Sequence, residues 1–277
     1  TNYGLPPEQF AKLQKELPGE VYITRTLATY SYELNNKKAP FDNVNIRKAL
    51  NLSLDRNVIT DKVLGQGQTP TYVFTPTYIE EGHLIQQPAY SKEPMAQRNE
   101  EAIKLLEEAG YSKANPLKFT ILYNTNENHK KVAIAAASMW KANTKGLIDV
   151  KLENQEWKTY IDSRRAGRYD AARAGWNADY NQATTFGNYF LSNSSNNTAK
   201  YANPEYDKAI AESYVATDAE GRAKAYAKAE EILAKDFGIV PIFNYVNPRL
   251  VKPYVKGYSG KDPQDHIYLR NLYIIKH

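Results

Sequence analysis

WKTYIDSRRAGRYDAARAGWNADY, residues 157–180, is the part of the chain that the other segments are arranged to hold in place. Its first part favours a helix, because four residues recur at helical spacing before Gly167 ends the pattern: Trp157, Tyr160, Ile161 and Arg164. From Tyr169 to Trp176 the residues alternate with a period of two, which predicts a strand. The stretch therefore predicts a helix, a turn, a strand and a loop in succession.

The predicted strand places Arg173 on one face with the small residues Ala171 and Gly175. A long cation beside such neighbours leaves an unfilled volume, which suits a ligand that carries a carboxylate. Further along the stretch Asp179 offers an anion, and Trp176 lies between the two charges. Arg173 and Asp179 together suggest recognition of the two ends of a zwitterion. The alternative is that they pair with each other or with neighbouring side chains.

The segments before this stretch alternate between strand and helix patterns. Val21–Leu34 is rich in β-branched and aromatic residues and predicts a long strand. Residues 44–64 predict one amphipathic helix, and the prolines of residues 65–94 predict an irregular segment. Next come a helix capped by Asn99 and ended by Gly110, a strand over 117–124, a helix beginning near His129 and a strand over 147–152. This order predicts a crossover in a mainly parallel mixed sheet of an α/β protein.

The C-terminal part predicts one further helix and two strands. Thr217 and Glu220 have the spacing of a capping box, so we expect a helix to start there and to end at Gly238. Residues 239–246 form an apolar run that predicts a strand. Residues 266–277 alternate and predict a final strand.

Composition excludes several classes of function. The chain has 42% hydrophobic and 24% charged residues, as a soluble globular protein does, and no apolar window of membrane-spanning length. Its net charge of +5 comes from interleaved charges rather than a basic stripe, so we expect no nucleic-acid partner. Because the sequence has no cysteine, it excludes disulfides and cysteine-based metal sites.

Sequence motifs for catalysis and metal binding are missing. The four histidines are far apart, and there is no Walker loop, no GxSxG elbow and no GxGxxG after a strand. We therefore expect no enzyme, no metal and no cofactor. His129 falls in the first turn of a predicted helix, where unpaired N–H groups and the helix dipole favour an anion. With Arg173 it would make a second position that attracts a carboxylate.

Several longer motifs resemble one known family. They are APFDNVNIRKALNLSLDRNVI (39–59), QRNEEAIKLLEEAGY (97–111), ILYNTNENHKK (121–131), the run from 154 to 186 around the opening stretch, and the tail 246–277. Over its whole length the chain is similar to bacterial extracytoplasmic solute-binding proteins of the peptide and nickel class, and within it to periplasmic oligopeptide-binding receptors of ABC importers. The resemblance implies a type II periplasmic-binding-protein lobe that closes with a second lobe over an extended short peptide. It also implies a periplasmic monomer that docks on the membrane subunits of an ABC permease and does no chemistry.

The resemblance assigns site residues by motif match. The aspartate that holds the α-amino group of the peptide matches Asp179 in WNADYN. The residues that meet the C-terminal carboxylate of short peptides match Arg173 in ARAGW and His129 in NENHKK. The residues that line side-chain pockets match Trp157, Arg164 and Trp176, and the tyrosines beside the hinge match Tyr30, Tyr32 and Tyr245.

The resemblance also implies a division of the chain. Residues 1–28 would belong to the partner lobe and the first hinge strand, residues 29–246 to the peptide-binding lobe, and residues 247–277 to the return into the partner lobe. The two crossings, at about Ala28 and Val246, would be the hinge. Chains of the family are nearly twice as long, so we expect an N-terminal half, with one wall of the cleft, to be missing here.

The chain departs from the family pattern at named positions. Some relatives carry a lysine near Leu64 that serves another peptide length, so the length preference stays open. A cysteine pair of some relatives appears here as Ala28 and Asn177. The same fold also serves receptors for murein peptide and haem, for which Arg164 would be the residue that meets an acidic ligand. A peptidase and a structural fragment without a small ligand are the alternatives from other classes.

Overall fold

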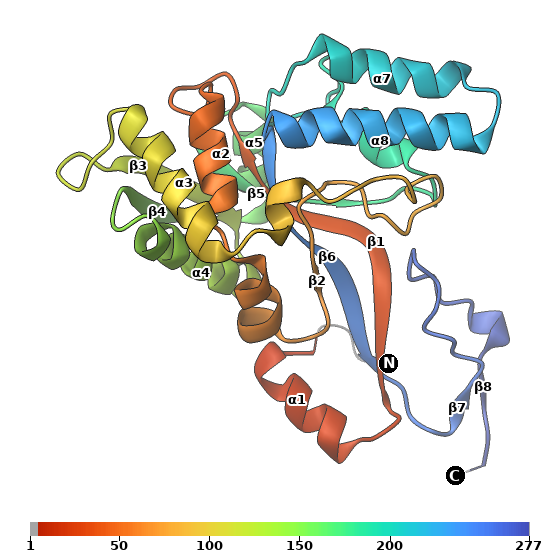
Figure 1. Cartoon of the computed structure of the whole chain (residues 1–277). Helices are drawn as coiled ribbons and strands as arrows, with labels where there is room; N and C mark the ends of the chain where they lie inside the picture. The colour runs from red at the N-terminus through yellow and green to blue at the C-terminus, as the bar shows by residue number, and fades with distance from the viewer. Residues whose placement is uncertain (1–4, 277) are drawn as a thin grey trace.

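The computed structural model describes residues 5–276, and these are built around one six-stranded sheet (Figure 1). The strand order in that sheet is β2-β6-β1-β5-β3-β4, and a separate small sheet, β7-β8, lies in the C-terminal tail. The strands are β1 (Val21–Leu34), β2 (Thr69–Pro70), β3 (Leu117–Asn124), β4 (Ile148–Gln155), β5 (Ala171–Asn177), β6 (Ile239–Leu250), β7 (Val255–Lys256) and β8 (Tyr273–Ile274).

The large sheet is mixed, as predicted, and its parallel pairings are confined to one side. β3 pairs in parallel with both β4 and β5. β1 pairs with β5 and β6, and β2 with β6, in the antiparallel sense. The parallel side is where helices cross between strands, since parallel neighbours need a long connection. The predicted crossover is therefore confirmed for β3, α4 (Glu127–Asn143) and β4.

Helices cover both faces of this sheet. They are α1 (Pro7–Glu16), α2 (Val44–Leu52), α3 (Met95–Glu108), α4, α5 (Trp157–Arg165), α6 (Thr184–Gly187), α7 (Pro204–Val215) and α8 (Ala219–Lys235), with a π-helical turn η1 (Val58–Leu64) and 3-10 turns η2 (Ala89–Lys92), η3 (Asn188–Phe190) and η4 (Leu269–Asn271). α2, α3 and α4 share one core with Ile121 of β3. Its neighbour Leu122 points to the opposite face and packs with Tyr160 of α5. α6, α7 and α8 form a second core around Phe186 and Phe190.

The single helix predicted over residues 44–64 is wrong, because two side chains break it. The Ser53 hydroxyl donates to the carbonyl of Ala49 at 2.6 Å, where α2 ends. The Asp55 side chain accepts from the N–H of Asn57 at 3.0 Å and starts a new turn, which leads into η1. Local side-chain bonds of this kind compete with a continuous helix.

Two predicted helix starts are also wrong. The helix expected to be capped by Asn99 begins at Met95, directly after Pro94, whose fixed φ leads the chain into the first turn. The cap of α8 is Asp218 rather than Thr217, because the Asp218 side chain accepts the N–H of Gly221 at 2.6 Å.

The final strand predicted over 266–277 is wrong for residues 266–276, and residue 277 lies outside the described residues. Only Tyr273–Ile274 forms a strand there, and it pairs with β7. Leu269 and Ile274 are 76% and 69% exposed. An alternating pattern forms a long strand only when a neighbouring strand pairs with it and a core covers one face.

β1 and β6 run side by side from the helical layers to the far end of the molecule (Figure 1). α1 and the tail with β7 and β8 lie near the far ends of these two strands, away from α7 and α8. The pairing is interrupted part-way, because Arg25 pairs with Val246 whereas Thr29 pairs with Asn244. Residues 26–28 of β1 therefore oppose Tyr245 alone, and the strands bulge at this point.

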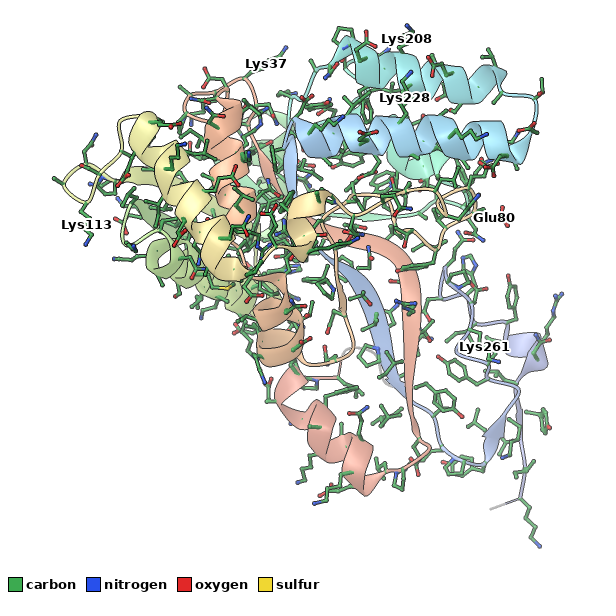
Figure 2. All side chains as sticks on the ribbon, in the orientation of Figure 1. Lys37, Glu80, Lys113, Lys208, Lys228 and Lys261 are labelled. Atoms are coloured by element: carbon green, nitrogen blue, oxygen red, sulfur yellow. The ribbon has the colours of Figure 1, made fainter. Side chains whose placement is uncertain are left out.

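Charged side chains are spread over the surface. Figure 2 shows Lys37, Lys113, Lys208 and Lys261 at widely separated points of the outline. Within residues 5–276, no helix has the length and apolar character needed to cross a membrane.

Candidate functional site

Arg173 of β5 extends its guanidinium over Gly175 to Tyr245 of β6. Its Nη2 donates to Tyr245 Oη at 2.6 Å, and its Nη1 lies 3.5 Å from Asn124 Oδ1. A Cβ atom at Gly175 would lie 3.0 Å from Nη2, so the glycine makes room for the guanidinium. Among the described residues, no Asp or Glu oxygen is within 4.0 Å of Arg173. The partners of Arg173 are thus uncharged neighbours, and the alternative of a pair with Asp179 is wrong.

His129 lies close to Arg173, with Tyr30 packed against both. The ring centroids of His129 and Tyr30 are 5.5 Å apart, and Arg173 Cζ is 5.2 Å from the Tyr30 ring centroid. Burial, together with the charge of Arg173, lowers the pKa of His129 from 6.5 to about 3. His129 is therefore neutral at pH 7 and offers one N–H donor and one acceptor.

The first turn of α4 has fewer free N–H groups for binding an anion than the sequence predicts. The Asn126 side chain already accepts from the N–H groups of Asn128 and His129, at 2.9 and 3.1 Å. These two amides are therefore not free for a ligand. The capacity of this helix end to meet a carboxylate depends on the His129 ring and on the nearby Arg173.

The three predicted hinge tyrosines divide between the core and the cavities. Tyr30 and Tyr32 are buried, and their rings meet edge to face with centroids 6.0 Å apart. Tyr32 also packs on Trp140, so it supports the site from the core rather than lining it. Tyr245 is half-buried and lines both cavities described below, and Tyr30 lines one of them.

Trp157 stands at the start of α5 and is 55% exposed. Its ring stacks on Tyr160, with the centroids 5.9 Å apart. The Tyr160 hydroxyl donates to the carbonyl of Arg173, which ties α5 to β5. The structure thus brings Trp157 and Arg173 to the same cavity.

Arg164 turns into the interior instead. Its Nη2 lies 2.9 Å from Glu33 Oε2 and also contacts the hydroxyls of Tyr189 and Thr198 at 3.2 and 3.0 Å. Those two hydroxyls donate to the Glu33 carboxylate as well. Arg164 therefore neutralises a buried anion and lines neither of the cavities beside Arg173. Its link to the other predicted residues is indirect, through Tyr189, which also meets the ring of Trp176.

Asp179 lies just beyond the end of β5, with an exposed side chain. Among residues 5–276, no basic nitrogen is within 4.0 Å of its carboxylate. Its N–H donates to Thr185 Oγ1 at 3.2 Å, and its carbonyl accepts from Gln264 Nε2 at 3.2 Å. Trp176 packs behind the strand, where its indole N–H donates to the Thr185 carbonyl at 3.0 Å and its ring meets Tyr189.

Two adjoining cavities lie beside Arg173, and we call them together the cleft. Asp179 is not among their lining residues, but its neighbour Ala178 lines the larger one. The larger, of about 550 Å³, is lined by Trp157, Arg173, Asn177, Ala178 and the tail residues 263–265. The smaller, of about 220 Å³, is lined by Tyr30, His129 and residues 126 and 128 of α4. Both are lined by Tyr245 and Asn247, so they meet at β6. Their combined size suits a small ligand.

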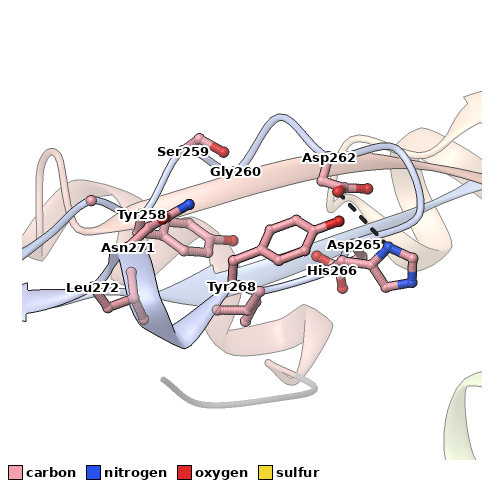
Figure 3. A pocket seen from close by; sticks show the side chains of 11 residues that line it. Tyr258, Ser259, Gly260, Asp262, Asp265, His266, Tyr268, Asn271 and Leu272 are labelled. Carbon is pink, nitrogen blue, oxygen red and sulfur yellow. Dashed lines mark ion pairs between the residues drawn. The ribbon is translucent and has the colours of Figure 1, made fainter.

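Other hollows do not hold the predicted residues. A groove of about 900 Å³ lies between α8 and residues 84–93, away from Arg173 and Asp179. A cavity of about 40 Å³ in the tail, lined by Tyr258 and Tyr268, is too small for a peptide (Figure 3). In the part of the chain that the structure describes, no group of three His, Cys, Asp or Glu side chains could hold a metal ion.

Several residues that contact Arg173 or Asp179 were not predicted from the sequence. Asn124, which contacts Arg173, ends a predicted strand within a quoted motif and so carried a usable signal. Thr185 and Gln264 carried none, because their hydrogen bonds to Asp179 depend on loop geometry and on a contact 85 residues away in sequence. Ala28 and Asn177, which replace a cysteine pair of some relatives, are register partners on β1 and β5.

Comparisons with known proteins identify the family of the chain. The family model of bacterial extracellular solute-binding proteins, family 5 Middle, matches residues 2–198. The periplasmic oligopeptide-binding protein OppA of Haemophilus influenzae is 97% identical over 277 residues, which are 100% of this chain and 51% of that protein. The chain spans about half the length of the curated relatives it matches.

Solved structures give the same result. A crystal structure of Haemophilus influenzae OppA in complex with RPPGFSPFR is 96% identical, with a TM-score of 0.94 over 100% of this chain and 54% of that chain. The structure of the Escherichia coli murein tripeptide binding protein MppA is 43% identical, with a TM-score of 0.91 over 99% of this chain and 53% of that chain. The predicted α/β class and type II periplasmic-binding-protein fold are confirmed. The chain belongs to the bacterial extracellular solute-binding proteins of family 5.

Proposed function

We propose that residues 1–277 form one half of a monomeric periplasmic receptor. The receptor captures peptides in extended form between two lobes and delivers them to an ABC permease without chemical conversion. One observation carries the proposal. Arg173 lies in the wall of the cleft without an anionic partner among the described residues, and Asp179 exposes a carboxylate without a cationic one. Asp179 directly follows Ala178, which lines the same cleft, so one unpaired charge lies in its wall and the opposite one beside it, which matches the charged ends of a peptide.

Strand geometry limits the distance between the two charges. From Arg173 to Asp179 the chain advances six residues, and an extended strand rises about 3.3 Å per residue, so their Cα atoms are at most roughly 20 Å apart. An extended peptide rises similarly, so the two residues can meet both ends of a peptide of up to about six residues. A nine-residue peptide such as RPPGFSPFR would span roughly 30 Å if extended. For such a ligand we propose that Asp179 holds the amino end and that the carboxylate lies beyond Arg173.

Two terminal contacts do not account for tight binding. A hydrogen bond to a charged group contributes about 1.5–3 kcal/mol, whereas micromolar affinity corresponds to about 8 kcal/mol. Main-chain bonds to the extended peptide and burial under the second lobe would contribute the rest. We propose that Trp157 covers one peptide side chain, and that Trp176, Arg164 and Tyr32 hold the walls from behind.

The same proposal divides the chain into lobes. Residues 29–246 would form the peptide-binding lobe, and residues 1–28 and 247–277 would join the partner lobe. The interruption of pairing at residues 26–28, opposite Tyr245, supports a hinge near Ala28 and Val246. The grouping of α1 with the tail at the far ends of β1 and β6 supports it too. Because the partner lobe would supply the other wall of the cleft, residues 1–277 alone should bind peptide weakly.

A receptor for another solute is the second candidate, since MppA shares the fold. Binding of an acidic solute through Arg164 finds less support, because Glu33 already holds that guanidinium. Tryptophan fluorescence of the longer receptor chain, titrated with a tripeptide, a murein tripeptide and haem, separates these candidates. The proposal expects saturable binding of the ordinary tripeptide, recovered intact by chromatography. Hydrolysis of that tripeptide, or binding of haem alone, would overturn it.

A further inference from the structure

We propose that Thr185 is a positioning residue, which holds the loop carrying Asp179 beside the cleft so that its exposed carboxylate keeps a fixed direction. The inference rests on the proposed function, because it concerns the residue that would bind the amino end of the peptide. It adds a residue outside the predicted site, in the short helix α6.

The hydroxyl of Thr185 is shared by two residues of this loop. Thr185 Oγ1 accepts from the Asp179 N–H at 3.2 Å and from the Trp176 indole N–H at 3.3 Å. Its own hydrogen points to Asp179 Oδ2 at 3.4 Å. A hydroxyl has one hydrogen and two lone pairs, so these contacts use all of its capacity. Thr185 is 4% exposed, so water does not readily replace them.

The tail holds the other side of the same residue. Gln264 Nε2 donates to the Asp179 carbonyl at 3.2 Å. The tail is itself fixed there, because the Pro263 carbonyl accepts from the N–H of Leu27 at 2.8 Å and Asp265 pairs with Arg249. Figure 3 shows Asp265 in this segment, beside Asp262 and His266, whose Oδ2 and Nδ1 atoms lie 3.9 Å apart. Both peptide groups of Asp179 are thus anchored while its carboxylate stays exposed.

Such anchoring favours binding of a cation. A carboxylate on a fixed backbone loses little freedom when an ammonium group binds, so more of the interaction remains as affinity. Without the Thr185 hydroxyl, the Asp179 N–H would lose its acceptor and the loop would sample other directions. Ligands with a charged amino end should then bind more weakly, whereas ligands without one should be unaffected.

The neighbouring Thr184 provides a matched control. It is also buried and lies on the same helix, but its hydroxyl bonds to Gln182 Oε1 at 3.0 Å and to Tyr226 Oη at 2.7 Å. Thr184→Val removes the same chemical group one position away, without touching Asp179. A general loss of packing in α6 would therefore show up in both threonine variants.

The test measures the affinity ratio of a tripeptide and its N-acetylated form in the longer receptor chain. We expect Thr185→Val to lower the affinity for the free tripeptide by about three- to tenfold, as loss of one hydrogen bond does, and to leave the affinity for the acetylated form unchanged. The ratio of the two affinities should fall by the same factor. Thr185→Ser should restore the ratio, and Thr184→Val should keep it. Gln264→Ala, at a half-exposed position, should lower the ratio in the same direction and serves if Thr185→Val does not fold.

Two different failures can be told apart. If the wild type discriminates against the acetylated peptide and Asp179→Asn abolishes this, but Thr185→Val and Gln264→Ala leave the ratio unchanged, the positioning role is wrong and the proposed function stands. The same holds if Thr185→Val weakens both peptides equally. If the wild type binds both peptides equally, then Asp179 is not the amino-end anchor and both proposals are overturned.

Discussion

Tyr245 Oη accepts a hydrogen bond from Arg173 Nη2 at 2.6 Å, although β1 lies between the strands that carry these two residues. Gly175 leaves the space through which they meet. A phenol orients a guanidinium without neutralising it, so Arg173 keeps its full charge for a ligand. This separates Arg173 from Arg164, whose charge is balanced by Glu33 inside the protein.

Tyr245→Phe removes this orientation and nothing else from the ring. We expect the affinity for a tripeptide with a free carboxylate to fall by about three- to tenfold, since one hydrogen bond is lost. The same tripeptide with an amidated C-terminus should bind Tyr245→Phe and wild type with equal affinity. Calorimetric titrations of the longer receptor chain measure both affinities. An equal loss for both peptides would show that Tyr245 acts on packing and not through Arg173.

Arg164→Met tests the internal role of the second arginine. The change leaves the Glu33 carboxylate, whose side chain is 0% exposed, without its cationic partner. The free energy of unfolding, measured in urea titrations, should fall by about 3–5 kcal/mol. The double variant with Glu33→Gln should recover part of that loss. Arg173→Met strands no anion and should cost less than Arg164→Met. Equal losses for the two arginines would contradict the ion pair.

His129 should make stability depend on pH. The pKa of His129 is about 3 in the folded chain, whereas the ordinary value of 6.5 applies to the unfolded chain. Between these two pH values His129 is therefore protonated in the unfolded chain and neutral in the folded chain. The free energy of unfolding should therefore fall as pH drops through this window, by at most about 1.4 kcal/mol per pH unit. His129→Gln should remove this component. Urea midpoints of both proteins at pH 7, 5.5 and 4 check it, and parallel pH curves would refute it.

Ala28 and Asn177 should accept a disulfide. The Leu27 carbonyl accepts from the Ala178 N–H at 2.8 Å, so the next pair, Ala28 and Asn177, is a non-hydrogen-bonded pair of β1 and β5. Its Cα atoms should be about 4.5 Å apart, within the range that a disulfide spans. We expect Ala28→Cys/Asn177→Cys to close on oxidation and to stabilise the fold by about 2–4 kcal/mol. Unchanged mobility on non-reducing gels would show that the register is different.

Much of the fold follows from local patterns, and the failures have both local and tertiary causes. Val21–Leu34 and Leu117–Asn124 form strands as predicted, because their side chains fit a half-buried pleated sheet and each has a neighbour. The helix over 44–64 fails because Ser53 and Asp55 bond to nearby backbone, which a periodicity argument ignores. The last strand fails because almost nothing pairs with it.

The site shows a similar division. The small neighbours of Arg173 predict space around its side chain, and the structure places Gly175 beneath its guanidinium. The interior position of Arg164 was missed, because its partner Glu33 is 131 residues away in sequence. Spacing along the chain finds residues that share one element. It cannot find contacts, such as Gln264 with Asp179, that the tertiary fold creates.

Capture of the amino end of the peptide by Asp179 is what the proposed function depends on. The decisive experiment is a calorimetric titration of wild type and Asp179→Asn, in the longer receptor chain, with a tripeptide and with its N-acetylated form. We predict that acetylation weakens wild-type binding by tenfold or more and leaves Asp179→Asn binding nearly unchanged, because each change removes the same charged contact. If acetylation costs the same in both proteins, or nothing in wild type, the account of this cleft is contradicted.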